Sequence, residues 1–173
     1  LGRLADTEPK ALSALEGRAA TDVNVYIAAW QAVVRGQPWG EKIMREGLAD
    51  PLRADLAASA MPRKEPRVTP FVNDLEGAVV RLAAGKRGSV IAGVLASIGA
   101  PAHAAVKRRL LDAKTRSAMC DGVGLPEASA DARGLVLEVG PEARDQASCV
   151  GVVLGLATRE DPSRSASDIL LLG

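Results

Sequence analysis

Few side chains in this 173-residue sequence have the chemistry that usually supports catalysis or metal binding. The sequence contains two cysteines, Cys120 and Cys149, and a single histidine, His103. A structural zinc site takes four Cys or His ligands and a catalytic one takes three, so these residues could barely supply one site even if all converged. No Ser or Cys motif lies beside His103, which is predicted to stand in the first turn of a helix. We therefore expect no metal site, no cofactor site and no catalytic residues.

Two glycine-containing strings resemble phosphate-binding loops only in part. Gly85-Lys86-Arg87 has Arg where a Walker A loop has Ser or Thr, and Val80 occupies the position of the first glycine of that motif. Gly122-Val123-Gly124 is followed by Pro126, and Glu127 stands where a dinucleotide-binding loop has its third glycine. These glycines are expected to end helices or to let two helices approach closely.

The charge distribution bears most directly on function. Residues 1–60 carry a net charge of −1, residues 61–120 carry +7, and residues 121–173 carry −5. If the middle of the chain folds as stacked helices, its basic side chains form a positive zone that could dock a partner. The side chains predicted to bind the partner are Arg63, Lys64, Arg67, Lys107, Arg108 and Arg109. The alternative is a solvated helix face next to a basic loop.

The composition indicates how these residues are positioned. Hydrophobic residues make up 47% of the chain, mostly Ala, Leu and Val, and aromatic residues only 2%. Small side chains suit helices packed on helices better than a sandwich of strands. In residues 1–60, for example, Asp22 can cap a helix that includes Tyr26 and Trp30 and ends at Gly36. Residues 61–70 contain three prolines and are expected to form a loop and an internal boundary.

Beyond this loop the sequence repeats itself. Three blocks, at residues 89–94, 118–123 and 147–152, align at an offset of 29 residues and end in Gly-Val. Each block is preceded by a segment with helical periodicity, so the pattern predicts helix pairs that stack on one another. The residues of these second helices predicted to be buried are Ile91, Val94, Cys120, Val123, Cys149 and Val152. Helices in a stack lie about 8 to 10 Å apart, so both cysteines are expected to be free thiols.

Two strings resemble the turn inside a HEAT repeat, where an Asp between the helices is followed by an Arg that enters the second helix. They are residues 48–57, with Asp50 and Arg53, and residues 111–118, with Asp112 and Arg116. The spacing of about 30 residues between successive repeats is similar to that of the short bacterial HEAT-like type. The resemblance extends over about residues 40–158. It implies a short α-solenoid. Arg87 and Arg144 stand where the same Arg of two further repeats would fall, although neither of them is preceded by the Asp.

A different interpretation of two segments leads to an α/β fold. Residues 134–140 are short, rich in branched side chains and bounded by glycines, which also describes a strand. If residues 89–97 were a strand as well, the solenoid interpretation would fail. The uncharged run at residues 88–106 has the length of a membrane span, but its Gly-Ala-Pro sequence is expected to divide it into two shorter helices.

The leading interpretation is an all-α protein with three parts. Residues 1–60 form an N-terminal helical region, residues 61–70 a Pro-rich basic loop, and residues 71–173 HEAT-like repeats with a C-terminal capping helix at residues 161–172. The corresponding function is a non-enzymatic scaffold that binds another protein or a second copy of itself. An enzyme or enzyme subunit with an α/β core is the first alternative, and nucleic-acid binding through the basic zone is the second. The sequence carries no mark of its compartment.

Overall fold

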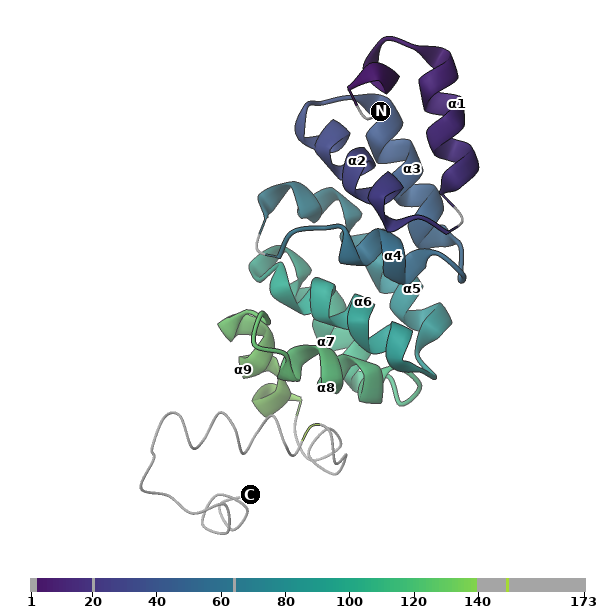
Figure 1. Ribbon diagram of the computed structural model, residues 1–173. Coiled ribbons are helices and arrows are strands. Elements are labelled where there is room, and N and C mark those ends of the chain that lie inside the picture. Colours follow the sequence, from purple (N-terminus) through teal and green to yellow (C-terminus); the bar gives the residue numbers. More distant parts are fainter. Residues whose placement is uncertain (1–2, 20, 64, 140–148, 150–173) are drawn as a thin grey trace, which may run out of the picture.

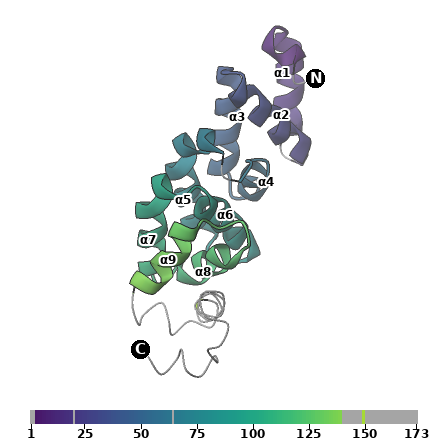
Figure 2. The ribbon, with the colours of Figure 1, turned by 90° about the vertical axis from the view of Figure 1, so that its left-hand side faces the viewer.

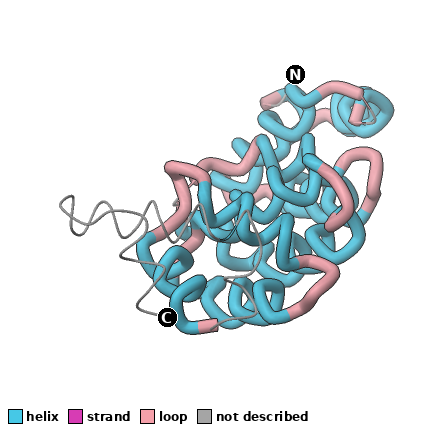
Figure 3. The backbone as a smooth tube through the Cα atoms, turned by 90° about the horizontal axis from the view of Figure 1, so that it is seen from below, coloured by secondary structure: helices cyan, strands magenta, loops and turns pink. Residues whose placement is uncertain are grey.

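The computed structural model describes residues 3–19, 21–63, 65–139 and 149, and within them the chain folds into helices and connecting loops without a strand (Figures 1 and 3). This confirms the prediction of an all-α fold. The α-helices described are α1 (Pro9–Arg18), α2 (Val23–Val34), α3 (Pro38–Ala49), α4 (Ala54–Ser59), α5 (Val72–Leu82), α6 (Lys86–Ser97), α7 (His103–Leu111), α8 (Arg116–Gly124) and α9 (Ala130–Glu138). Short 3₁₀ helices are η1 (Leu4–Asp6), η2 (Pro66–Phe71) and η3 (Ala100–Ala102).

Local signals in the sequence set where several helices begin and end. The Asp22 carboxylate accepts a hydrogen bond from the backbone N–H of Asn24 at 2.9 Å and so caps the N-terminus of α2. Gly36, with a φ of 75°, follows the end of that helix in the left-handed conformation that glycine adopts without strain. The uncharged run at residues 88–106 is divided as predicted, because α6 ends at Ser97 and Gly99 has a φ of 82°.

The α/β alternative is wrong for both segments on which it rested. Helix α6 covers residues 89–97, and α9 covers residues 134–138. At the start of α9, the Ser129 hydroxyl accepts a hydrogen bond from the backbone N–H of Ala132 at 3.1 Å, which caps the helix. Helix α9 contacts α7 and α8, and its Leu135 and Val136 side chains are buried, so helix packing decides between the two periodicities.

Most of the helices lie in two rows that run along the molecule (Figures 1 and 2). The first row is α3, α5, α7 and α9, in which each helix contacts the next. The second row is α4, α6 and α8, again with successive contacts, and the contact between α6 and α8 is the most extensive among the helices described. Helices of the two rows also contact each other in chain order, α3 with α4, α5 with α6 and α7 with α8.

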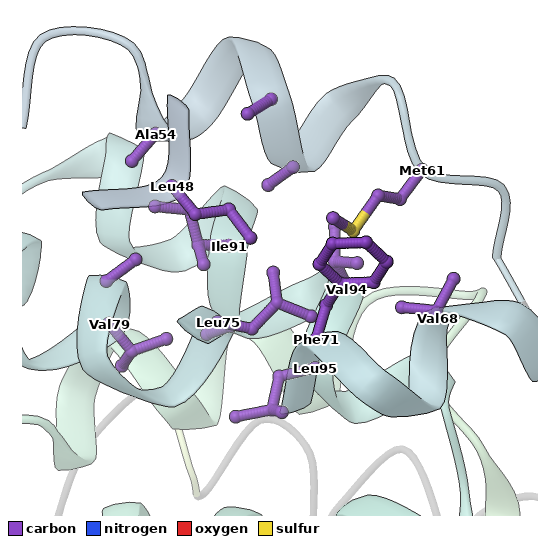
Figure 4. Packing of buried hydrophobic residues seen from close by; sticks show 14 of the residues in the cluster. Leu48, Ala54, Met61, Val68, Phe71, Leu75, Val79, Ile91, Val94 and Leu95 are labelled. Carbon is purple, nitrogen blue, oxygen red and sulfur yellow. The ribbon is translucent and has the colours of Figure 1, made fainter. Parts of the chain in front are cut away.

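The Pro-rich segment at residues 61–71 contributes several buried side chains to the hydrophobic core. Met61, Val68 and Phe71 are each no more than 2% exposed and belong to the hydrophobic cluster that also contains residues of α3, α5 and α6. Figure 4 shows Met61 and Phe71 close to Val94 on α6. The last part of the segment forms η2, so the predicted loop is partly a 3₁₀ helix.

The predicted core residues that the structure describes are buried. Ile91 and Val94 on α6, Cys120 and Val123 on α8, and Cys149 have no exposed surface. His103 lies in the first turn of α7, as expected. Several predictions lie outside the described residues: Lys64, Arg144, Val152 and the capping helix at 161–172.

The prediction of two free thiols is wrong, because Cys120 and Cys149 form a disulfide. Their Cα atoms are 5.0 Å apart, well inside the range that a disulfide requires. The prediction assumed an ordinary spacing between helices. The 5.0 Å separation of the two Cα atoms is well below the 8 to 10 Å of that assumption.

None of the helices in the described part of the chain combines the length and the apolar character needed to cross a lipid bilayer.

Candidate protein-binding surface

The basic run predicted to bind a partner lies on α7, where acidic side chains of the neighbouring helices pair with it. Arg108 donates two hydrogen bonds to Glu76 of α5, at 3.0 and 2.7 Å. Arg109 lies 3.2 Å from Glu76 and 3.1 Å from Asp112. These two arginines and two carboxylates carry no net charge together, so they present little positive potential to a partner.

Glu76 is the centre of this group of charges. Its side chain is 14% exposed and faces two guanidinium groups. Hydrogen bonds from Arg108 hold the pKa of the Glu76 carboxyl below its usual value of 4.5, and burial opposes this shift without cancelling it. The same contact raises the pKa of Arg108. Both groups therefore remain charged near neutral pH.

Ion pairs of this kind connect neighbouring helices along one side of the molecule. They join α1 to α3 and then each member of the first row to the next. The pairs are Lys42–Glu16, Arg45–Asp74, Arg108–Glu76 and Lys107–Glu138. The two residues of each pair are 26 to 32 positions apart in the sequence. This separation is about the length of one helix pair. We call this set the ion-pair ladder.

Other basic side chains bind backbone carbonyls at the ends of helices. A helix C-terminus has carbonyls without intrahelical partners and a partial negative charge, so a guanidinium group is stabilising there. These contacts run from Arg81 to Leu48 O at 2.7 Å, from Arg116 to Leu110 O at 2.8 Å and from Arg133 to Leu125 O at 3.0 Å. Part of the positive charge of residues 61–120 is therefore used inside the fold.

Arg63 differs from these residues. It lies in the loop before η2, beside α6, where a Cβ added at Gly93 would be 3.2 Å from its Nη1 atom. That Nη1 atom is buried and has no hydrogen-bond partner within the described part of the chain. Arg67 is 3.6 Å from Glu65 of the same segment, and its side chain is 54% exposed. Arg63 and Arg67 are the predicted docking residues that no neighbouring helix neutralises among the residues described.

The two turns that resemble HEAT repeats have a common hydrogen-bond pattern. Asp50 accepts a bond from the backbone N–H of Leu52 at 2.8 Å, and Asp112 accepts one from that of Lys114 at 3.0 Å. The first of these bonds holds the pKa of Asp50 below its usual value. Each Asp thus fixes the turn between two successive helices, which explains its place in the sequence pattern.

The sequence did not reveal which acidic residues would meet the basic run. Glu76 and Glu138 are unremarkable as single residues, and only their distance of about one helix pair from Arg108 and Lys107 relates them. The two pairs are separated by 32 and 31 residues, so a search for opposite charges at the 29-residue offset alone would have missed both. No cluster of three potential metal ligands occurs in the part of the chain that is described.

Comparisons with protein-family models, with curated proteins and with solved structures gave no match for this chain.

Proposed function

We propose that this protein is a non-enzymatic scaffold that binds another protein, built as a short α-solenoid of HEAT-like helix pairs. Three features support the architecture: two rows of helices in register, the turns at Asp50 and Asp112 with a common hydrogen bond, and the 29-residue offset between blocks. Stacks of this kind expose long surfaces composed of successive helices and their turns. Such surfaces suit the recognition of an extended partner.

We place the docking surface at residues 61–70. The observation that carries this choice is the Arg63 guanidinium, which has no acidic partner among the described residues although every basic residue of the α7 run has one. The segment is anchored by Met61 and Val68 in the core, while Pro62, Pro66 and Arg67 are exposed. A segment that is already fixed loses little conformational entropy when a partner binds.

The chemistry of this surface favours an acidic protein segment. Arg67 is exposed and Arg63 is half-buried, with its Nη1 atom covered, and their planar guanidinium groups match a carboxylate. The exposed Pro62 and Pro66 present an apolar surface without backbone donors. Lys107, Arg108 and Arg109 remain predicted docking residues, but their pairing makes them part of the stack in this proposal. Reversing all three charges would break the ion-pair ladder, so it would not test docking alone.

The test compares two double charge reversals of equal size. Arg63→Glu/Arg67→Glu changes the proposed surface, and Lys86→Glu/Lys114→Glu changes two exposed lysines elsewhere. Native complexes of the wild type and both variants are purified from cells of the source and identified by mass spectrometry. We expect the control to keep the partners of the wild type and the Arg63/Arg67 variant to lose them, with circular dichroism unchanged in both.

Two results would overturn the proposal. One is the capture of the same proteins by all three chains, and the other is the capture of none by the wild type. Duplex DNA is titrated in parallel, because binding to phosphates falls steeply between low and physiological salt. Tight, salt-sensitive DNA binding that depends on Arg63 would favour the nucleic-acid alternative instead.

A further inference from the structure

The disulfide connects equivalent positions of two successive repeats. Cys120 and Cys149 are 29 residues apart, which is also the offset between the repeated blocks. Ile91 occupies the same place one block earlier and has no exposed surface. The two cysteines of the disulfide thus occupy the position that Ile91 occupies in the preceding block.

Both cysteine side chains are completely buried. A redox-active pair needs a sulfur that an attacking thiolate can reach, so this disulfide lacks the access that exchange requires. No cluster of potential metal ligands includes either residue in the described part of the chain. These observations indicate a structural bond.

We propose that oxidation of Cys120 and Cys149 is a maturation step that fastens the chain at Cys149 onto α8, and that the protein works in an oxidising compartment. In this step the two thiols lose two protons and two electrons, and an S–S bond forms. The oxidant is a small-molecule or protein disulfide, which is reduced to two thiols as its own S–S bond breaks. Structural disulfides persist in oxidising compartments and are rare where thiol reductants dominate.

Burial gives this step an order in time. Once α8 is packed, the sulfur atoms are inaccessible, so oxidation must occur before or during folding. The same burial then protects the bond, because a reductant reaches it only after local opening. The sequence repeats the glycine of the close helix contact, Gly122, at Gly151, in the same position relative to the second cysteine.

The first experiment measures the thiols directly. The purified full chain is refolded with oxidised glutathione, alkylated in denaturant and weighed by mass spectrometry. We expect no alkylated cysteine, and reduction of the native protein by dithiothreitol at least about tenfold slower than reduction in denaturant. Two alkylated thiols after refolding, or equally fast reduction of native and unfolded protein, would overturn the structural bond.

The second experiment measures what the bond contributes. Reduction of the wild type should lower its Tm by roughly 10 °C, since the bond closes a loop of about 30 residues. The variant Cys120→Ala/Cys149→Ala should melt near the reduced wild type and not respond to reductant. Val123→Ala, a buried change on the same helix, should lower the Tm yet retain the full response to reductant. A wild-type Tm independent of reductant would contradict the proposal.

The compartment is tested in cells of the source by rapid acid quenching, alkylation and mass spectrometry of this chain. We expect the oxidised form to predominate. A fully reduced pool in the quenched cells would exclude the oxidising compartment even if the bond forms in vitro.

Discussion

The two rows of helices are held together by different forces. In the second row, α6 and α8 meet through small residues, and α6 is buried continuously over residues 91–97. In the first row, neighbouring helices are joined by the ion-pair ladder, whose members are partly open to solvent: Arg108 is 55% and Lys107 45% exposed. The second row thus depends on close packing, and the first row adds charge pairs to its packing.

This difference indicates which row of helices tolerates substitutions. A buried contact between small residues is close-packed, so any added atom must displace a neighbouring atom. An exposed ion pair gains little in water because solvation and salt compete with it. We therefore expect steep losses of stability from changes in the second row and graded, pH- or salt-dependent losses in the first row.

The largest effect is expected when a charge is introduced into the second row. Val123→Asp on α8 places a carboxylate where the side chain has no exposed surface, and it should lower the free energy of unfolding by about 4 kcal/mol. The matched control is Val80→Asp on α5 in the first row, where the side chain is 48% exposed. Urea denaturation measures both. Equal stability of the two variants would show that the rows do not differ as described.

A single methyl group tests the close helix contact. Gly122→Ala would bring a Cβ to 2.5 Å from the Ala92 carbonyl carbon and 2.6 Å from the Gly93 nitrogen. Both are backbone atoms, which cannot relieve the overlap by a change of rotamer. We expect a loss of about 3 kcal/mol. At Gly17 in α1 an added Cβ meets nothing within 4 Å, so Gly17→Ala should stabilise by about 0.5 to 1 kcal/mol. Thermal melting of the two variants in opposite directions is the expected result.

In the first row, Glu76→Gln should have an intermediate effect. The variant loses the carboxylate that faces Arg108 and Arg109, at a cost of about 1 to 2 kcal/mol at neutral pH. Folding depresses the pKa of Glu76 below 4.5, so its contribution is present above pH 4.5 and is lost as the pH falls through the folded value. The stabilities of wild type and variant should therefore converge in acid.

An exposed carboxyl serves as the control for the loss of a charge. Glu8→Gln changes an exposed side chain at the start of α1, and it should change the free energy of unfolding by no more than about 0.5 kcal/mol at neutral pH. A gap between wild type and Glu76→Gln that stays constant from pH 7 to about pH 2 would contradict the role of the ion pair.

The smallest effect is expected for the outermost pair of the ladder. Lys107 and Glu138 are 3.4 Å apart, and both side chains are about half exposed. Lys107→Gln should cost about 0.5 kcal/mol or less in dilute buffer and nothing measurable in high salt. A loss as large as that of Glu76→Gln would mean that exposure does not govern the strength of these pairs.

Much of the fold followed from local features of the sequence. Asp22 and the residues after it were sufficient to place the start of α2, and the Gly-Ala-Pro sequence was sufficient to separate α6 from α7. The burial of Ile91 and Val123 followed from the repeated blocks. Such predictions succeed because capping, turn formation and periodicity act over a few residues and depend little on the rest of the chain.

The candidate site was less predictable. A charge count identified Arg108 and Arg109 as basic, but it could not show that Glu76 of α5 pairs with both of them. In the sequence, Arg63 was selected only for its positive charge, like the three basic residues of the α7 run. The structure distinguishes Arg63 from these residues, because it lies beside Gly93 and has an Nη1 atom with no hydrogen-bond partner among the described residues. Whether a charge is available to a partner depends on neighbours that are distant in the sequence.

The sequence by itself favoured helices, and it determined where several of them begin and end and which residues repeat at an offset of 29, because these depend on local conformation and side-chain size. Helix packing decided against strands at residues 89–97 and 134–138. The tertiary structure alone decided that Cys120 reaches Cys149, that the Pro-rich segment packs onto α6, and that the basic run is paired. The physical reason is distance: a disulfide or an ion pair requires two groups within a few ångströms. Only the packed helices bring together atoms that lie about 30 residues apart.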